Sequence, residues 1–466
     1  MGRRQTCAIL ALTCCGCTHG VLDPYAYAPK TPSSIYQQPL DITDVTAFSE
    51  DNPLSLAEIL DIALRNNPAT KLTWAKARAA AAYYGRSQSP NFPVLSGNFT
   101  YERSKITYPP EFGTPRFVQY LSDWGPELAL TYTLLDFGQT RAATEAARQA
   151  LLYADFTHNR QIQTTLQRVT SDYYNYLSQR ELLKSQEADL CTAETTFTAV
   201  EHELNAGVKD KSDKLQAQTQ LLQTKIQLVN QRQTVINAKA RLLTDMGVNA
   251  NQSIHIELLP AVPPIDEMLK SADQLLTIAL RKRADLIAAE ARLRSHEAAV
   301  DAAWRRFWPT ITYNLTAFQE LSNPGGNLNV NYTSTIALNI PIFSGLSTLN
   351  NLKEERAKKV GAEAELRQTQ LNVIQDVVTS HASVKSAFDA LQFADSLLET
   401  SEKQYEVILH RYKAGVATIL ELVTAQSTLA DARASQVSSS NQWLNSLVAL
   451  SYAAGTLEPP KRKDYQ

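Results

Sequence analysis

Two long stretches of the chain carry an apolar residue at every seventh position. One lies between Gly138 and Gly207, the other between Gly345 and Gly415. Gly361 is the only glycine inside them and proline is absent, so each can form a helix of roughly 100 Å at about 1.5 Å per residue. A repeat of seven is typical of coiled coils. The repeated positions are Ile162, Val169, Tyr176, Leu183, Leu190, Phe197 and Leu204, and then Val377, Val384, Leu391, Leu398, Tyr405 and Tyr412.

A second helical segment follows each long stretch. Residues 208–246 and 416–454 again lack both glycine and proline. Glycine readily adopts the left-handed conformation that ends a helix. The sequence therefore predicts two helical hairpins, with Gly207 and Gly415 at their apices.

In the first long stretch, the positions four residues after these apolar positions form a second set with the same repeat. Its residues are apolar at first and become polar toward the apex. After Leu166 and Tyr173 it continues through Arg180, Glu187, Glu194 and Glu201. In a solid bundle both lanes would stay apolar. One interpretation is a hollow wall with water on one side, and the other is a solvated outer face.

The segments before the long stretches alternate between apolar and polar residues, which is the pattern of strands. The apolar set includes Leu95, Phe99, Tyr101, Leu128, Leu130 and Tyr132 in the first half, and Ile311, Tyr313, Leu315, Tyr332, Ile336 and Leu338 in the second. The polar set consists of Thr, Asn and Ser rather than charged residues, as a water-filled lumen requires. We predict four strands near the roughly 9–11 residues of an outer-membrane strand. Four strands are too few to enclose an open lumen, so several chains must share one barrel.

The chain contains the same plan twice. Ile62-Ala63-Leu64-Arg65 returns as Ile278-Ala279-Leu280-Arg281 at an offset of 216 residues, and a strand pair, a long helix and a hairpin follow each copy. We predict a mainly α protein with a small β part, made of two tandem repeats. The predicted regions are a signal segment 1–17, an extended arm 18–53, repeat one at 54–250, a connector 251–270, repeat two at 271–455 and a tail 456–466.

Composition excludes several classes of function. Charged residues make up 20% of the chain and the net charge is −2, so no basic surface for nucleic acid is expected. Four of the five cysteines lie in the signal segment and Cys191 stands alone, which predicts neither a disulfide framework nor a cysteine metal site. The seven histidines lack metal-ligand spacing, so we expect no catalytic residues, cofactor or metal. Cys17 follows a small residue and is a candidate for acylation, with simple cleavage as the alternative.

The order of elements resembles the TolC-like outer membrane efflux proteins, and within them the lipidated branch for drug and metal efflux. The resemblance covers residues 54–455 and is most specific in the repeated Ile-Ala-Leu-Arg helix, in Pro93 and Pro309 before the strands, and in the apex Arg411-Tyr412-Lys413-Ala414-Gly415. It implies a homotrimer whose strands form a barrel in outer-membrane lipid and whose helices form a periplasmic tunnel. It further implies two partners, a periplasmic adaptor protein and an inner-membrane pump.

The same resemblance implies a periplasmic gate around Gly207 and Gly415. The family's closing contacts correspond here to Ser212, Asp213, Tyr412 and Ala417, and Ala417 stands where the family has an arginine. We call these closing contacts the latch. The half of the latch that is a hydrogen bond, between Ser212 and Tyr412, is therefore expected to remain. Glu421 corresponds to an acidic ring at the entrance, with an exposed surface carboxylate as the alternative.

Two other functions stay open at this stage. Type I protein secretion uses a similar outer-membrane tunnel, and the sequence does not name the cargo. A periplasmic coiled-coil adaptor or scaffold would also combine an export signal with long hairpins. Four strands and a duplicated layout favour the channel over the scaffold.

Overall fold

The computed structural model describes Asp23, Tyr25 and residues 31–33, 53–110, 115–207, 209–252, 254–257, 271–323 and 329–459. The signal segment with Cys17, and most of the predicted arm and connector, lie outside these residues. The elements are α1 (Leu56–Asn66), α2 (Pro68–Ser87), the 3-10 helix η2 (Ser89–Asn91), β1 (Val94–Tyr108), β2 (Phe117–Leu135), α3 (Gln139–Asn205), α4 (Lys211–Asp245), α5 (Ala272–Lys282), α6 (Ala284–Arg305), β3 (Thr310–Asn323), β4 (Asn329–Asn339), α7 (Ser347–Lys413) and α8 (Ile419–Ala453).

The chain divides into two compact units. Unit 1 comprises Met1–Ala28, Ala77–Ala154 and Ala289–Leu366, and unit 2 comprises the remaining residues. The predicted tandem plan is confirmed, because two helices, two strands, a long helix and a shorter helix follow one another twice in the same order. Helices α3 and α7 are 67 residues long, and α4 and α8 are 35 residues long.

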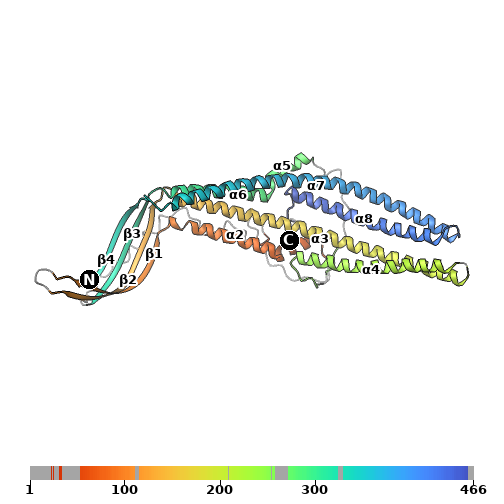
Figure 1. Ribbon diagram of the computed structural model, residues 1–466, viewed down its shortest axis with the longest axis horizontal. Helices are drawn as coiled ribbons and strands as arrows, with labels where there is room; N and C mark the ends of the chain where they lie inside the picture. The colour runs from red at the N-terminus through yellow and green to blue at the C-terminus, as the bar shows by residue number, and fades with distance from the viewer. Residues whose placement is uncertain are drawn as a thin grey trace, which may run out of the picture. The chain divides into compact units, whose positions relative to one another are not determined.

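Unit 1 contains one antiparallel sheet of four strands in the order β1-β2-β3-β4, drawn side by side in Figure 1. The predicted faces are confirmed, because Thr131, Asn314 and Thr335 are partners across three adjacent strands. On the opposite face the apolar side chains are exposed, and Phe99 and Tyr332 are more than 70% accessible. β1 and β4 form the two edges, so each lacks a partner strand on one side within the sheet.

Three strands are longer than the predicted 9–11 residues. β1, β2 and β3 contain 15, 19 and 14 residues, and only β4, with 11, falls in the predicted range. The β1–β2 pairing continues past the alternating segment to Tyr108 and Phe117. Cross-strand hydrogen bonds form between backbones, so they extend the strands where side-chain alternation no longer marks them.

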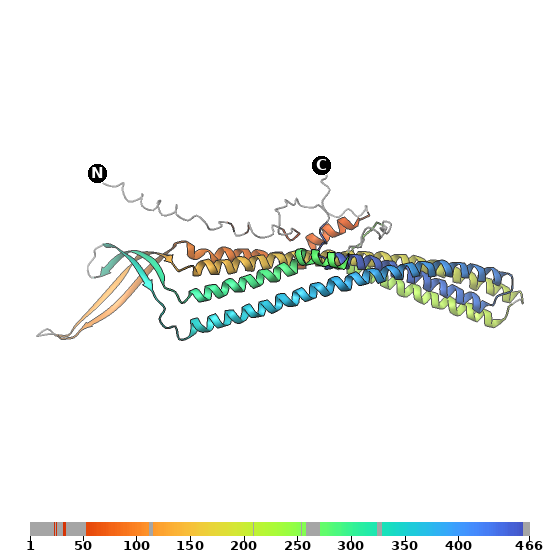
Figure 2. The same ribbon diagram turned by 90° about the horizontal axis from the view of Figure 1, so that it is seen from above.

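Unit 2 contains the two helical hairpins, with the α3–α4 turn and the α7–α8 turn visible in Figure 2. The apex glycines Gly207 and Gly415 have φ angles of 75° and 73°, as predicted for helix ends. At the other end of α4, residues Ile59, Val169, Leu242 and their neighbours form a buried core that joins α1, α3 and α4. Within the described helices, no segment has the length and hydropathy needed to cross a membrane.

The first root, which we define as Asn67, Asp245 and Gly247, fixes the end of α4 to the α1–α2 junction. The side-chain amide of Asn67 donates to the carbonyl of Asp245 at 2.8 Å. Gly247 has a φ of 73°, and a Cβ atom there would lie 2.6 Å from the carbonyl of Asn66. Only glycine fits this close approach without movement.

The second root, Arg283, Ala453 and Gly455, repeats this junction at the end of α8. Arg283 takes the place of Asn67, and its Nη1 donates to the carbonyl of Ala453 at 3.4 Å. A Cβ atom on Gly455 would lie 3.2 Å from the Cα of Arg283. The duplication therefore extends to contacts as well as to element order.

Candidate functional site: the hairpin apices and the second root

The apices of the two hairpins share one small apolar core. Val200 and Ala217 come from the first hairpin, and Tyr412, Ile419 and Leu422 come from the second. Among the described residues, every backbone hydrogen bond in these turns stays within its own hairpin. The two apices are therefore joined through side chains alone, and we call this group the apex core.

Tyr412 connects the apex core to a polar contact. Its side chain is buried, and its hydroxyl donates to the Oε2 of Glu203 at 3.2 Å. The ammonium of Lys209 lies 4.8 Å from the centre of its ring. Burial, and then the negative charges of Glu203 and Asp213, raise the pKa of Tyr412 to about 12, so the hydroxyl keeps its proton at neutral pH.

The other predicted latch residues lie near this contact without taking part in it. Ser212 is exposed in the first turn of α4, and the Tyr412 hydroxyl bonds to Glu203 instead. Asp213 is the third residue of α4, and its backbone N–H bonds to the capping carboxylate of Asp210. Ala417 is buried in the apex core, so an arginine at that position would have to displace its neighbours. The Ser212–Tyr412 latch stays a prediction.

The sequence analysis did not single out Glu203, because the residue belongs to neither of the repeating sets of positions in the first long stretch. It precedes Gly207 by four positions and Tyr412 precedes Gly415 by three, so the two residues lie at similar distances from their apices. This similar spacing was the available clue, and it becomes usable only when the hairpins are known to pack against each other.

Glu421 has a structural task at the start of α8. Its carboxylate accepts from the N–H of Thr418 at 3.1 Å, and the Thr418 hydroxyl accepts from the N–H of Glu421 at 3.3 Å. This reciprocal capping box satisfies two free donors of the helix end. Glu421 is nevertheless exposed, so its charge faces solvent and the acidic ring stays a prediction. The Thr-x-x-Glu signature is readable in the sequence.

An ion pair joins the hairpins further from the apices. Arg433 on α8 lies 2.6 Å from the Oδ1 of Asp189 on α3, and both side chains are partly buried. Burial raises the pKa of Asp189, although the charge of Arg433 opposes that rise. The side-chain amide of Gln426 also donates to Thr196 at 2.9 Å, so in this region α8 contacts α3 through both an ion pair and a hydrogen bond.

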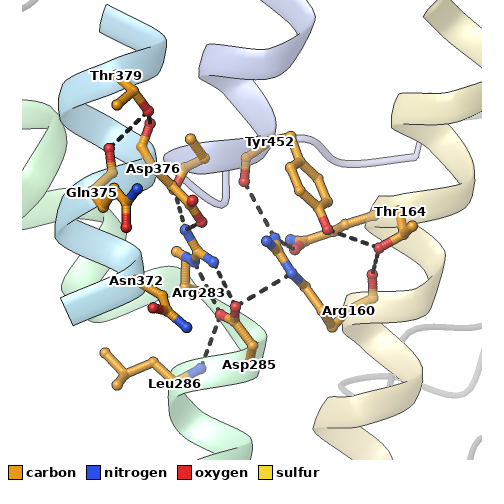
Figure 3. A network of polar contacts seen from close by, with 12 residues as sticks. Arg160, Thr164, Arg283, Asp285, Leu286, Asn372, Gln375, Asp376, Thr379 and Tyr452 are labelled. Carbon is orange, nitrogen blue, oxygen red and sulfur yellow. Dashed lines mark hydrogen bonds and ion pairs between the residues drawn. The ribbon is translucent and has the colours of Figure 1, made fainter. Parts of the chain in front are cut away.

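The second root extends into the network of charges drawn in Figure 3. The Arg283 side chain is only 3% exposed, and it contacts the carboxylates of Asp285 at 2.6 Å and Asp376 at 2.8 Å. Burial alone would raise the pKa of Asp285, but hydrogen bonds from Arg283 and the charge of Arg160 hold it below its ordinary value. Asp285 therefore stays ionised and paired at neutral pH.

Arg160 brings α3 into the same network. Its guanidinium stacks 3.7 Å from the ring centre of Tyr452 and donates to the Tyr452 carbonyl at 3.3 Å. The Tyr452 hydroxyl in turn pairs with Thr164 at 2.9 Å. Residues from α3, the α5–α6 junction, α7 and α8 thus meet in one cluster. Sequence reasoning missed it, because no motif marks contacts between four distant segments.

The described residues hold no group of three or more His, Cys, Asp or Glu side chains that could bind a metal ion. Helical hairpins joined at their tips, together with a sheet that is apolar on one face and polar on the other, define a class of membrane-embedded conduits. The family model for "outer membrane efflux protein" matches residues 59–248 and 275–456. The chain belongs to this outer membrane efflux protein family, whose members are channels that lie in the outer membrane and extend into the periplasm.

Known proteins of similar sequence cover nearly the whole chain. The protein CyaE of Bordetella pertussis is 28% identical over 423 residues, which span 88% of this chain and 87% of that protein. The toluene efflux pump outer membrane protein TtgC of Pseudomonas putida is 23% identical and covers 92% and 89%. The crystal structure of the CmeC outer membrane channel of Campylobacter jejuni matches the fold with a TM-score of 0.75 at 19% identity, covering 91% and 96%.

Proposed function

We propose that this chain is the outer-membrane exit duct of a tripartite efflux system, passive in itself and formed by three copies. A periplasmic adaptor protein and an inner-membrane pump are its proposed partners. The family match supports an efflux channel. The sheet supports the proposal of a trimer, because its edge strands β1 and β4 each have no partner strand on one side within the sheet.

The sheet carries the argument for a shared barrel. Four strands cannot close a barrel, the smallest closed barrels of about eight strands are filled by side chains, and an exposed apolar face needs lipid. Pairing β1 of one copy with β4 of the next would satisfy both edges and close a barrel of twelve strands. The row of Thr131, Asn314 and Thr335 would then face the lumen.

The test is the mass and conductance of the purified protein. Light scattering in detergent should give the mass of three chains, and reconstitution into planar bilayers should give discrete conductance steps. A monomeric mass with no conductance would contradict the proposal. A heat-resistant trimer that shows no conductance steps would mean that the trimer forms but its channel is closed in the bilayer.

We propose small apolar molecules as the cargo class and protein secretion as the competing outcome. Among the similar proteins, TtgC is a toluene efflux pump outer membrane protein and ArpC is an antibiotic efflux pump outer membrane protein. Deleting the gene should sensitise cells to apolar solvents or antibiotics. Unchanged sensitivity together with loss of one secreted protein would assign the chain to secretion.

The predicted sites and regions are proposed together with this function. Gly207, Ser212, Asp213, Tyr412, Gly415 and Ala417 form the proposed gate region, Glu421 the entrance ring, and Cys17 the acylation site. The proposed repeats at 54–250 and 271–455 are separated by the connector 251–270. Mass spectrometry of the mature protein tests Cys17, because acylation adds a lipid mass to an N-terminal cysteine peptide.

A further inference from the structure

The apolar face of the β1–β2 pair ends in two basic residues. Residues that are partners across the two strands lie on the same face, so the register separates the faces. Along the apolar face the partners are Leu95 with Leu130, Gly97 with Leu128, Phe99 with Pro126 and Tyr101 with Trp124. The next two positions of β1 on this face are Arg103 and Lys105, opposite Ser122 and Tyr120. The face therefore changes from apolar to cationic directly after Tyr101.

Tyr101 and Trp124 mark the place of this change. Their ring centroids lie 6.4 Å apart, and Tyr101 is 62% exposed. Tyrosine and tryptophan are enriched where the hydrocarbon core of a membrane meets the headgroups. From Trp124 to Tyr132 the face spans 8 positions, which is about 27 Å along the strand and about 21 Å of height at a tilt of about 40°. Since an outer-membrane barrel has an apolar band of roughly 25 Å, Arg103 and Lys105 lie at the level of the headgroups.

The basic residues belong to the end of the sheet that points away from the helices. β2 leads into α3 at its Leu135 end, and family members extend into the periplasm from the outer membrane. The opposite end of the sheet therefore lies at the outer leaflet. There the β1–β2 pairing continues for five residue pairs beyond Ser122 and Asn323, the last partners of β2 and β3 (Figure 2). Lys105 lies in this extension, where β3 no longer flanks β2.

Charge is divided between the two faces. Arg103 and Lys105 are the only basic residues within β1, β2, β3 and β4, and both lie on the apolar face. Glu102 and Asp123 are partners on the other face, where Glu127 also lies. The β1–β2 pair therefore presents only cations to the membrane side and only carboxylates to the opposite side.

Neither cation is neutralised by a carboxylate within the described part of the chain. Both side chains are exposed, and neither Arg103 nor Lys105 forms an ion pair there. The ammonium of Lys105 lies 5.7 Å from the ring centre of Tyr120 on the same face. By contrast, the exposed Lys358 and Lys403 each pair with a glutamate one helical turn away. The two cations beside the apolar band are thus available to an external anion.

We propose that Arg103 and Lys105, which we call the outer rim, bind the phosphate groups of anionic lipids in the outer leaflet. Alternate residues of a strand are about 7 Å apart, so the rim can contact two neighbouring phosphates. Arginine and lysine both bind phosphate, and basic clusters at a membrane surface attract anionic lipids. The apolar face below the rim favours a lipid over a free anion, because it contacts the chains of the same molecule.

Native mass spectrometry of the purified full-length protein tests the outer rim. Delipidated protein is mixed with equal amounts of phosphatidylglycerol, which is anionic, and phosphatidylcholine, whose phosphate is balanced by choline. The rim variant is Arg103→Gln with Lys105→Gln. The matched control is Lys353→Gln with Arg356→Gln, which removes two charges from exposed positions of α7 in the same unit.

The parent and the control should retain roughly threefold more phosphatidylglycerol than phosphatidylcholine, and the rim variant should retain the two lipids equally. Arg103→Lys should keep most of the preference, because it keeps the charge. In the parent, the preference should fall as salt rises from about 0.1 M to about 1 M, since the Debye length shrinks from about 10 Å to about 3 Å.

Three results would overturn the outer rim. They are equal retention of both lipids by the parent, an unchanged preference in the rim variant, and the same loss of preference in the control. Displacement of phosphatidylglycerol by inorganic phosphate at an equal concentration of charge would assign the rim to free anions instead of lipids. The inference rests on the membrane position of the sheet and not on the number of copies. Its failure would therefore leave the mass and conductance expected of the duct unchanged.

Discussion

Asp155 places an acid group inside unit 2. The residue is fully buried, and neither carboxyl oxygen has a hydrogen-bond partner. Burial raises the pKa of Asp155 to about 8, so the carboxyl group is mainly protonated at neutral pH. Its raised pKa therefore makes the stability of the fold depend on pH.

We expect the folded state to lose stability as pH rises from about 4 to about 8. The folded pKa lies above the unfolded value, so the stabilising contribution is complete below the unfolded pKa and is lost as pH rises through the folded pKa. The slope is on the order of 1 kcal/mol per pH unit. Asp155→Asn should remove this slope and raise the thermal midpoint at pH 8 but not at pH 4. Parallel pH profiles for the parent and the variant would contradict the assignment.

The contact between Tyr412 and Glu203 predicts how the resting gate is held. A hydrogen bond to a charged group contributes about 1.5–3 kcal/mol, and the proposed trimer contains three of them. Tyr412→Phe and Glu203→Gln should each raise resting conductance in planar bilayers. The double variant should conduct little more than either single variant, because both substitutions break the same contact. Ser212→Ala separates this contact from the latch predicted from the sequence, because the Tyr412 hydroxyl donates to Glu203 in this structure. A conductance rise in Ser212→Ala alone would restore the latch predicted from the sequence.

At the scale of elements, the sequence predicted helices better than strand lengths or sites. α3 and α7 were predictable because their stretches have almost no glycine and a regular seam. The ends of β1 and β2 were not, since their pairing depends on a partner backbone. The partner of Tyr412 was missed for a related reason, because Glu203 lies 209 positions away in the sequence.

Glu421 combines a helix cap with a charge, and two substitutions separate the roles. Glu421→Gln keeps the capping box, in which glutamine can replace glutamate, but removes the charge. We expect a smaller preference for cations over anions and an unchanged thermal midpoint. Glu421→Ala should lower the midpoint as well, because the cap costs about 1 kcal/mol to lose. The reversal potential in a salt gradient measures selectivity, and an unchanged value in Glu421→Gln would reject the acidic ring.

At the scale of the whole molecule, the two roots have the same geometry but different strengths. Arg283→Met would remove a buried guanidinium that pairs with Asp285 and Asp376, but Asp376 is 47% exposed, so the loss should lie below the about 3–5 kcal/mol of a fully buried pair. Asn67→Ala removes one neutral hydrogen bond, worth about 1 kcal/mol. The midpoint of denaturant unfolding should therefore fall more for Arg283→Met. Equal decreases in the two midpoints would mean that the charged network in Figure 3 stabilises the fold no more than the single hydrogen bond of Asn67 does.

The absence of backbone bonds between the apices, within the described residues, has a thermodynamic consequence. Separating the hairpin tips means repacking a few side chains and breaking a few polar contacts, which is small beside the roughly 8 kcal/mol released when a partner binds with micromolar affinity. In the proposed trimer, a partner could open the apices only by the amount by which it binds the open state more tightly than the closed state. A difference of a few kcal/mol for each of three partners would then shift the apices to the open state, and dissociation of the partners would return the closed state.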